Sequence, residues 1–128
     1  MSTIIVTNIK ATGETASRAV SGVAAAWVNF NGTGTIAVRD SNNVSSLTDI
    51  GTATYGTNFT SNMNNADFAV SSTCQYGGSG TSLNACLRNN GGAYPLTTGD
   101  AHIFLVSDYS VSATDGAVVV ASIHGDLA

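Results

Sequence analysis

Apolar and polar residues alternate in short runs along most of this chain. A period of two places successive side chains on opposite faces of an extended strand, so the pattern predicts strands and not helices. Segments rich in Asn, Asp, Ser and Gly separate the runs, and these residues tolerate the backbone angles of tight turns. The predicted strands cover residues 3–9, 23–30, 35–41, 43–49, 53–60, 66–74, 81–88, 101–107, 109–113 and 117–124.

Short strands that follow one another with turns between them are typical of sandwiches and barrels. We therefore expect an all-β fold, a β-sandwich or jelly-roll-like knob, over residues 23–128. Residues 1–22 are expected to form an N-terminal docking arm and connector, because an Ala-rich stretch at 13–26 suits a short helix or a mobile connector. The run Asn31–Gly34 predicts a tight reversal, and the Asp115-Gly116 pair predicts a hairpin turn.

The composition indicates a folded domain with a weakly charged surface. Charged residues make up 9% of the chain, against roughly 25% in ordinary soluble domains. Ser, Thr, Asn and Gly together account for 57 of the 128 residues, so they must cover the surface that charges leave free. The apolar fraction of 43% argues against disorder, and the length suffices for a single core without metal or disulfide staples.

The charge balance excludes several classes of partner. The formal net charge is −4, and only four residues are cationic, so no basic patch for nucleic acid is expected. No apolar run approaches the ~18 residues of a membrane span. The first ten residues lack the basic and long apolar regions of a secretion signal, so we expect synthesis in the cytoplasm and no export by that route.

The residues that usually carry chemistry are scarce and scattered. His102 and His124 have no Cys, Asp or Glu beside them at the spacing of metal ligands. The Gly-rich run at 77–81 lacks the strand-to-helix setting of a nucleophile elbow. Glycoside cleavage needs two carboxylates, and Glu14, the one Glu, lies in the arm. We expect a protein that is not an enzyme and holds no metal or cofactor.

The two cysteines, Cys74 and Cys86, admit two readings. They are either free thiols or a disulfide that forms after the protein leaves the reducing cytoplasm. The spacing of the two residues does not decide between these readings.

The aromatic residues divide between predicted strands and predicted loops. Those in strands are expected to pack in the core. Tyr76 and Tyr94 lie in Gly-rich loops, the second near Asn90, and exposed tyrosines flanked by Asn are suited to stacking on sugars. We name Tyr76, Asn90 and Tyr94 as the candidate binding loop surface.

A long segment at residues 26–60 resembles one that recurs in tailed phages, marine phages in particular. There it lies in the C-terminal domains of tail-fibre and related virion structural proteins. The similar residues are Ala26-Trp27-Val28-Asn29-Phe30-Asn31-Gly32-Thr33-Gly34-Thr35, Arg39, Asn43-Val44-Ser45-Ser46, Thr48-Asp49, Gly51, Tyr55 and Asn58-Phe59-Thr60. Residues 64–71 and 124–126 are also similar, so the resemblance covers about half of the chain.

The resemblance implies a phage virion structural protein, a short fibre or knob displayed on the particle, with a host-surface glycan as a further candidate partner. A capsid decoration protein and a lectin-like carbohydrate-binding module are the alternatives. The arm, with Ile4 and Val6, is expected to dock onto another virion protein by strand addition.

Self-association is expected through the strand that carries Trp27 and Phe30. These two residues lie an odd number apart, so they face opposite sides of a regular strand. One side then packs on the core and the other on a neighbouring chain. We expect a homotrimer that forms without residues 1–20, because fibre tips of this kind are commonly three-fold and closed symmetry leaves no growing edge.

Overall fold

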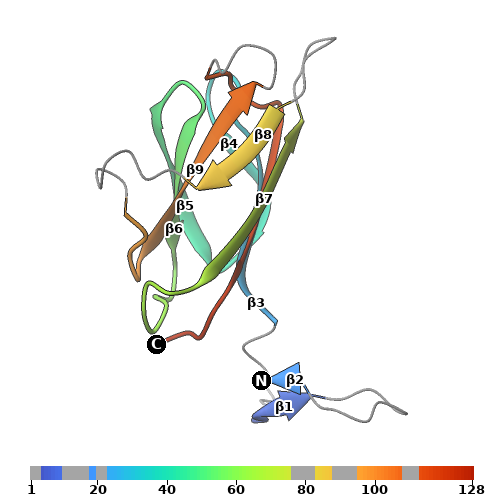
Figure 1. The fold of residues 1–128 in the computed structure, drawn as a ribbon, viewed down its shortest axis with the longest axis vertical. Coiled ribbons are helices and arrows are strands. Elements are labelled where there is room, and N and C mark those ends of the chain that lie inside the picture. Colours follow the sequence, from blue (N-terminus) through green and yellow to red (C-terminus); the bar gives the residue numbers. More distant parts are fainter. Residues whose placement is uncertain (1–3, 10–17, 20–22, 76–82, 88–94, 108–112) are drawn as a thin grey trace.

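The computed structural model describes residues 4–9, 18–19, 23–75, 83–87, 95–107 and 113–128. All its regular elements are strands, and two four-stranded antiparallel sheets form a β-sandwich, as predicted (Figure 1). One sheet has the order β4-β3-β10-β7 and the other β5-β6-β9-β8, while β1 and β2 form a separate pair. The strands are β1 (Asn8–Ile9), β2 (Arg18–Ala19), β3 (Ala24–Asn31), β4 (Ala37–Asn42), β5 (Val44–Gly51), β6 (Thr54–Phe59), β7 (Ala69–Gln75), β8 (Leu83–Leu87), β9 (Asp100–Ser107) and β10 (Val118–His124).

Period-2 alternation builds the core between the two sheets. In the central strands β3 and β10, every second side chain is fully buried, and β6 sends Tyr55, Thr57 and Phe59 inward from the opposite sheet. The Phe30 and Tyr55 rings meet edge to face with centroids 5.1 Å apart, and this contact joins the two sheets. The other large buried residues include Val28, Met63, Phe68, Ile103, Val119 and Ile123.

Asn43 turns the chain from one sheet into the other. It is the single residue between β4 and β5, and its φ of 56° lies in the left-handed region. Its side chain donates from Nδ2 to the Ser61 carbonyl oxygen (3.0 Å) and accepts at Oδ1 from the Ser61 N–H (2.7 Å). Asn tolerates this backbone conformation better than most residues, and here its amide also fixes the corner.

Substitutions at Asn43 should separate the contribution of its side-chain hydrogen bonds to stability from that of its left-handed backbone conformation. Asn43→Gly keeps the backbone conformation accessible but removes both side-chain bonds, so we expect a loss of about 1–2 kcal/mol in the free energy of unfolding. Asn43→Ala adds a left-handed non-Gly residue, which costs about 1 kcal/mol more. Urea denaturation of the two variants measures both values, and equal stabilities would contradict the role given to the backbone angle.

The other side of the sandwich is closed by β7 and β8, which lie side by side. Cys74 is in β7, where it faces the interior side, and Cys86 is in β8. The two cysteines therefore belong to neighbouring edge strands of different sheets. These two described cysteines are not joined by a disulfide bond in the structure, and a bond formed by later oxidation stays a hypothesis.

The Tyr55 hydroxyl group ties together three turns at one end of the sandwich. It lies 2.9 Å from both the Gly32 carbonyl oxygen and Asp115 Oδ1, which share its one proton. Asp115 Oδ1 also accepts from the Ala53 N–H at 2.7 Å, and the Gly32 N–H donates to the Gly116 carbonyl oxygen at 2.9 Å. We call these five residues the Tyr55 hub.

The hub explains two glycine-containing turns. A Cβ at Gly32 would lie 2.5 Å from the Tyr55 hydroxyl oxygen, so only glycine fits beside the phenol. The Asn31–Gly34 reversal joins β3 to β4 as predicted. The hairpin predicted at Asp115-Gly116 is wrong. β10 follows this pair and has β3 on one side and β7 on the other, so neither edge is left for the segment that precedes Asp115. The carboxylate of Asp115 serves the hub instead.

Burial raises the pKa of the Tyr55 phenol well above its usual range, and the hydrogen bond to Asp115 raises it further. The folded state therefore holds this proton more tightly than the unfolded chain, whose tyrosine pKa is about 10. The resulting stability is complete below pH ~10 and is lost as the pH rises toward the folded pKa.

We expect the free energy of unfolding to fall above pH ~10 by up to about 1.4 kcal/mol per pH unit from this group. In Tyr55→Phe this part of the slope should be absent, although the variant is less stable at neutral pH because the hub loses its donor. Urea midpoints between pH 8 and 11 compare the two proteins. Parallel slopes would exclude the buried phenol as the source.

Two other predicted elements need correction, and a third is not described in full. The strand predicted at 3–9 is reduced to Asn8–Ile9, which pairs with β2, and residues 4–6 lie outside any strand. The short helix considered at 13–26 is wrong for its described residues, because Arg18–Ala19 and the start of β3 are strands. Pairing with β10 overrides the helix propensity of the alanines. The strand at 109–113 falls outside the described residues except for Ala113.

Candidate functional site

The outer face of the β4-β3-β10-β7 sheet carries Trp27 on its inner strand β3, toward the end where the arm joins. Trp27 pairs with Asn42 of β4 on one side and with Ser122 of β10 on the other, and Ser122 pairs with Ser71 of β7. Its own strand neighbours Ala26 and Val28 are fully buried, so Trp27 faces outward and is half-buried by the surrounding strands. A large aromatic side chain therefore lies on the open face of a rigid sheet.

Phe30 faces the opposite side of β3, as the sequence predicted. It is fully buried and packs on Tyr55 in the core of the single chain. Of the two residues proposed for assembly, Phe30 therefore serves the core, and Trp27 is the one that a neighbouring chain can reach.

Val118 and Val120 add apolar area to the same face, one strand away from Trp27. They alternate with the buried Val119 and Ala121, and each is half-buried. Val120 lies between Asn29 and Thr73, its partners in β3 and β7. Sequence reasoning missed these two valines because the run "AVVVAS" resembles a core strand throughout. Their odd spacing from Ile123 is the signal that separates them from the core.

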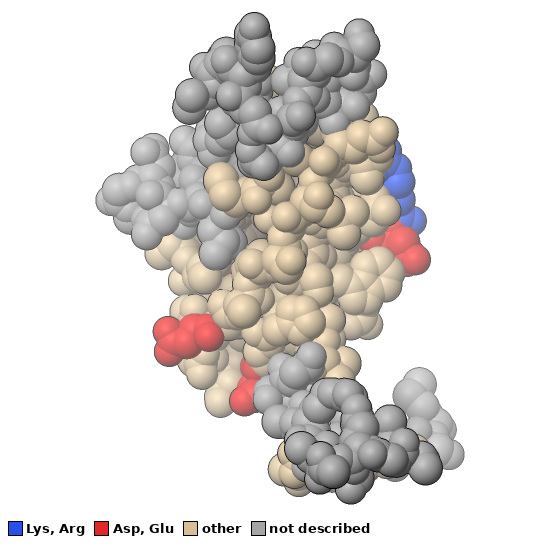
Figure 2. Space-filling model, turned by 45° about the vertical axis from the view of Figure 1, so that its right-hand side comes forward, with Lys and Arg blue, Asp and Glu red and all other residues tan. Residues whose placement is uncertain are grey.

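Among the described residues, the charges of this face belong to Arg39 and Asp40 of β4, and the Arg39 guanidinium group reaches over β3 to the start of β10. Arg39 donates from Nη2 to the Ala117 carbonyl oxygen (2.6 Å) and from Nη1 to Asn29 Oδ1 (3.3 Å), and Asp40 lies next to it. Elsewhere Ser, Thr and Asn surround the apolar groups. On the side of the molecule that Figure 2 shows, charged side chains occupy small areas among uncharged described residues.

The outer face of the other sheet differs in kind. Its side chains bond to one another: Asn58 Nδ2 donates to Thr48 Oγ1 (3.0 Å) and to Ser46 Oγ (3.2 Å). His102 lies against Gly56, with Nε2 3.8 Å from Asp100 Oδ2. This polar face has no aromatic anchor among its described side chains.

The remaining predicted site residues fall into two groups. In the arm, the side chains of Ile4 and Val6 are 85% and 47% exposed, so both can contact a partner. Tyr76, Asn90 and Tyr94, the candidate sugar-binding residues, lie outside the described residues. His124 Nε2 lies 3.1 Å from Ser122 Oγ, a contact between side chains of one strand.

Within the described ranges, His, Cys, Asp and Glu form no group of three that could hold a metal ion. The same ranges contain no helix of the length and apolarity that a bilayer span requires. Comparison of the chain with protein-family models, with curated proteins and with solved structures gives no match. The resemblance to phage virion proteins therefore stays a prediction.

Proposed function

We propose that this chain is a non-enzymatic structural protein of a tailed-phage particle, a β-sandwich knob that assembles with identical copies through the outer face of β3 and β10. The observation that carries the proposal is the half-buried, outward-facing Trp27, with Val120 diagonally across from it on β10 and Val118 farther along the same strand. The resemblance of residues 26–60 to virion proteins supports the particle as the setting.

Two physical properties favour self-association through this face: burial of its aromatic side chain and weak repulsion between identical chains. An aromatic anchor surrounded by small polar groups is the usual centre of a protein interface. Identical acidic chains with few charges repel one another weakly at close approach. Closed rotational symmetry, such as the predicted trimer, covers one such face on every copy without leaving another exposed.

The layout of the sandwich suits a displayed knob. The N-terminal end of β3, where the arm joins, and the C-terminus lie at the same end of the sandwich (Figure 1). The Tyr55 hub lies at the opposite end, where β3 finishes and β10 begins. Attachment through the arm would leave the hub end facing outward.

The particle setting is tested by finding the chain on virions. Antibodies against the purified protein should label particles in electron micrographs, and the protein should co-purify with them at a fixed number of copies. Labelling of the tail tip supports the fibre or knob, and uniform labelling of the head supports the capsid decoration protein. Absence from purified particles would refute the proposed function.

Self-association is tested with a charge on the open face. Light scattering at micromolar concentration should give the mass of a trimer for the full-length protein and for residues 21–128, which lack the arm. Trp27→Lys in residues 21–128 should give a monomer with an unchanged circular dichroism spectrum. Thr52→Lys is the matched control, since Thr52 is exposed and lies in the turn before β6, away from this face. A monomeric wild-type protein, or a trimer that survives Trp27→Lys, would contradict the assignment.

A further inference from the structure

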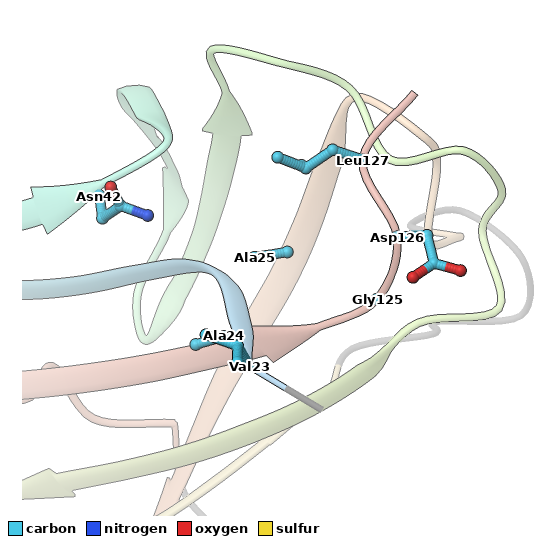
Figure 3. Close-up of a pocket in the computed structure, with 7 residues that line it drawn as sticks. All are labelled: Val23, Ala24, Ala25, Asn42, Gly125, Asp126 and Leu127. Atoms are coloured by element: carbon cyan, nitrogen blue, oxygen red, sulfur yellow. The ribbon is translucent and has the colours of Figure 1, made fainter. Parts of the chain in front are cut away.

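A groove opens at the end of the sandwich where the arm joins the body. Its volume is about 330 Å³, and it is lined by Val23, Ala24, Ala25, Asn42, Gly125, Asp126 and Leu127. Figure 3 shows Leu127 reaching over it from the C-terminal segment, with the short side chains of the alanines along β3. Val23 and Leu127 are 50% and 49% exposed, so its walls are apolar and open to solvent.

The groove exists because β3 is longer than its neighbour β4. The last β3–β4 pair joins Trp27 to Asn42, and the chain then turns at Asn43 into the other sheet. Beyond that pair, Ala24 and Ala26 are paired with β10, with no described strand on the β4 side. An unpaired strand edge flanked by apolar walls is a site for strand addition.

The chain itself carries a segment of matching chemistry. Ile4, Ile5 and Val6 are 85%, 93% and 47% exposed, three consecutive β-branched residues on the surface. Such residues favour extended backbone, and leaving them in water forfeits the free energy of apolar burial. A short β-prone segment of this kind fits a groove only a few residues long.

The β1–β2 pair limits how far the segment extends along its own chain. Asn8 pairs with Ala19 and Ile9 with Arg18. Ile4 lies four residues before Asn8, whereas Ala24–Ala26 lie five to seven residues after its partner Ala19, so an extended segment of the same chain is too short to pair with them. The segment of another chain is under no such limit.

Charge favours a second copy. Residues 1–22 contain Lys10, Arg18 and Glu14, a formal charge of +1, whereas residues 23–128 have a formal charge of −5. Asp126 lines the groove, and Lys10 closely follows the aliphatic segment. An arm of one copy is thus attracted to the body of the next.

We propose that the groove beside Ala24–Ala26 binds the Ile4–Val6 segment of a second copy by strand addition, so that neighbouring chains exchange arms. The incoming backbone pairs with the open edge of β3, and its aliphatic side chains pack on Val23 and Leu127. This contact adjoins the Trp27 face, since Asn42 lines the groove and pairs with Trp27. It does not depend on where the protein sits in a particle.

Site-specific cross-linking of full-length chains tests the exchange. Ile5→Cys and Leu127→Cys are made in separate chains, co-expressed and mildly oxidised. Trypsin cuts after Lys10 and Arg88, so a link between the two sites joins peptide 1–10 to peptide 89–128 in the mass spectrum. Val38→Cys replaces Leu127→Cys in the matched control, since Val38 is 45% exposed but lies outside the groove.

The yield of the 5–127 link should exceed that of the 5–38 link at least about tenfold, because docking raises the effective concentration of the two thiols. An excess of synthetic peptide 1–10 should suppress the link, and the same peptide with Ile5→Asp should not. Equal yields at positions 127 and 38 would overturn the proposal. So would a chain carrying both substitutions that links only within itself as a monomer, because its own arm would then fill the groove.

Failure here is distinguishable from failure of the proposed function. If the protein is absent from virions but still forms the 5–127 link, only the proposed particle setting is refuted. If the protein is found on virions but does not form the link, only the proposed arm exchange is refuted.

Discussion

Both sheets of the sandwich meet at the hydroxyl group of Tyr55. The side chain starts in β6 and crosses the interior, and its oxygen is held by Gly32 after β3 and by Asp115 before β10. Because burial leaves no water to replace these partners, the relative position of the sheets at this end follows from one phenol. The packing of Phe30 on the same ring carries that constraint into the core.

The opposite end is held by different means. Asn43 fixes Ser61 through two hydrogen bonds, and backbone bonds join Asn64 to Asp126 and Ala128 to Asn62. These contacts hold the C-terminal segment beside the loop after β6. None of these contacts reaches the start of β3, so the groove lies between the start of β3 and the C-terminal segment.

The sequence predicted those features that depend on local alternation. Trp27 and Phe30 were assigned to opposite faces of β3 from their spacing alone, and the all-β sandwich followed from repeated short runs. Prediction failed where pairing between segments far apart in the sequence determines the local structure. The alanines at the start of β3 favour a helix locally, yet β10 holds them as a strand. Asp115-Gly116 has the composition of a hairpin turn, but its carboxylate is committed to Tyr55 and Ala53.

The candidate surfaces show the same division. Trp27 could be found from period alone, whereas Val118 and Val120 join it only because β10 lies beside β3 in the sheet. The groove could not be predicted from the sequence. It forms because β4 ends opposite Trp27, whereas β3 already begins at Ala24. Tyr76, Asn90 and Tyr94 lie outside the described residues, so the loop surface stays a prediction.

The antiparallel pairing of β3 with β10 has a mechanical consequence. A force applied between the arm and the C-terminus acts at one end of this pair, so it would peel the strands apart one hydrogen bond at a time from Ala24 and His124. A force applied between the arm and the hub end instead runs along β3 and loads its bonds to β4 and β10 together in shear. A body tethered by its arm and pulled at the hub end therefore resists unfolding in its stronger direction.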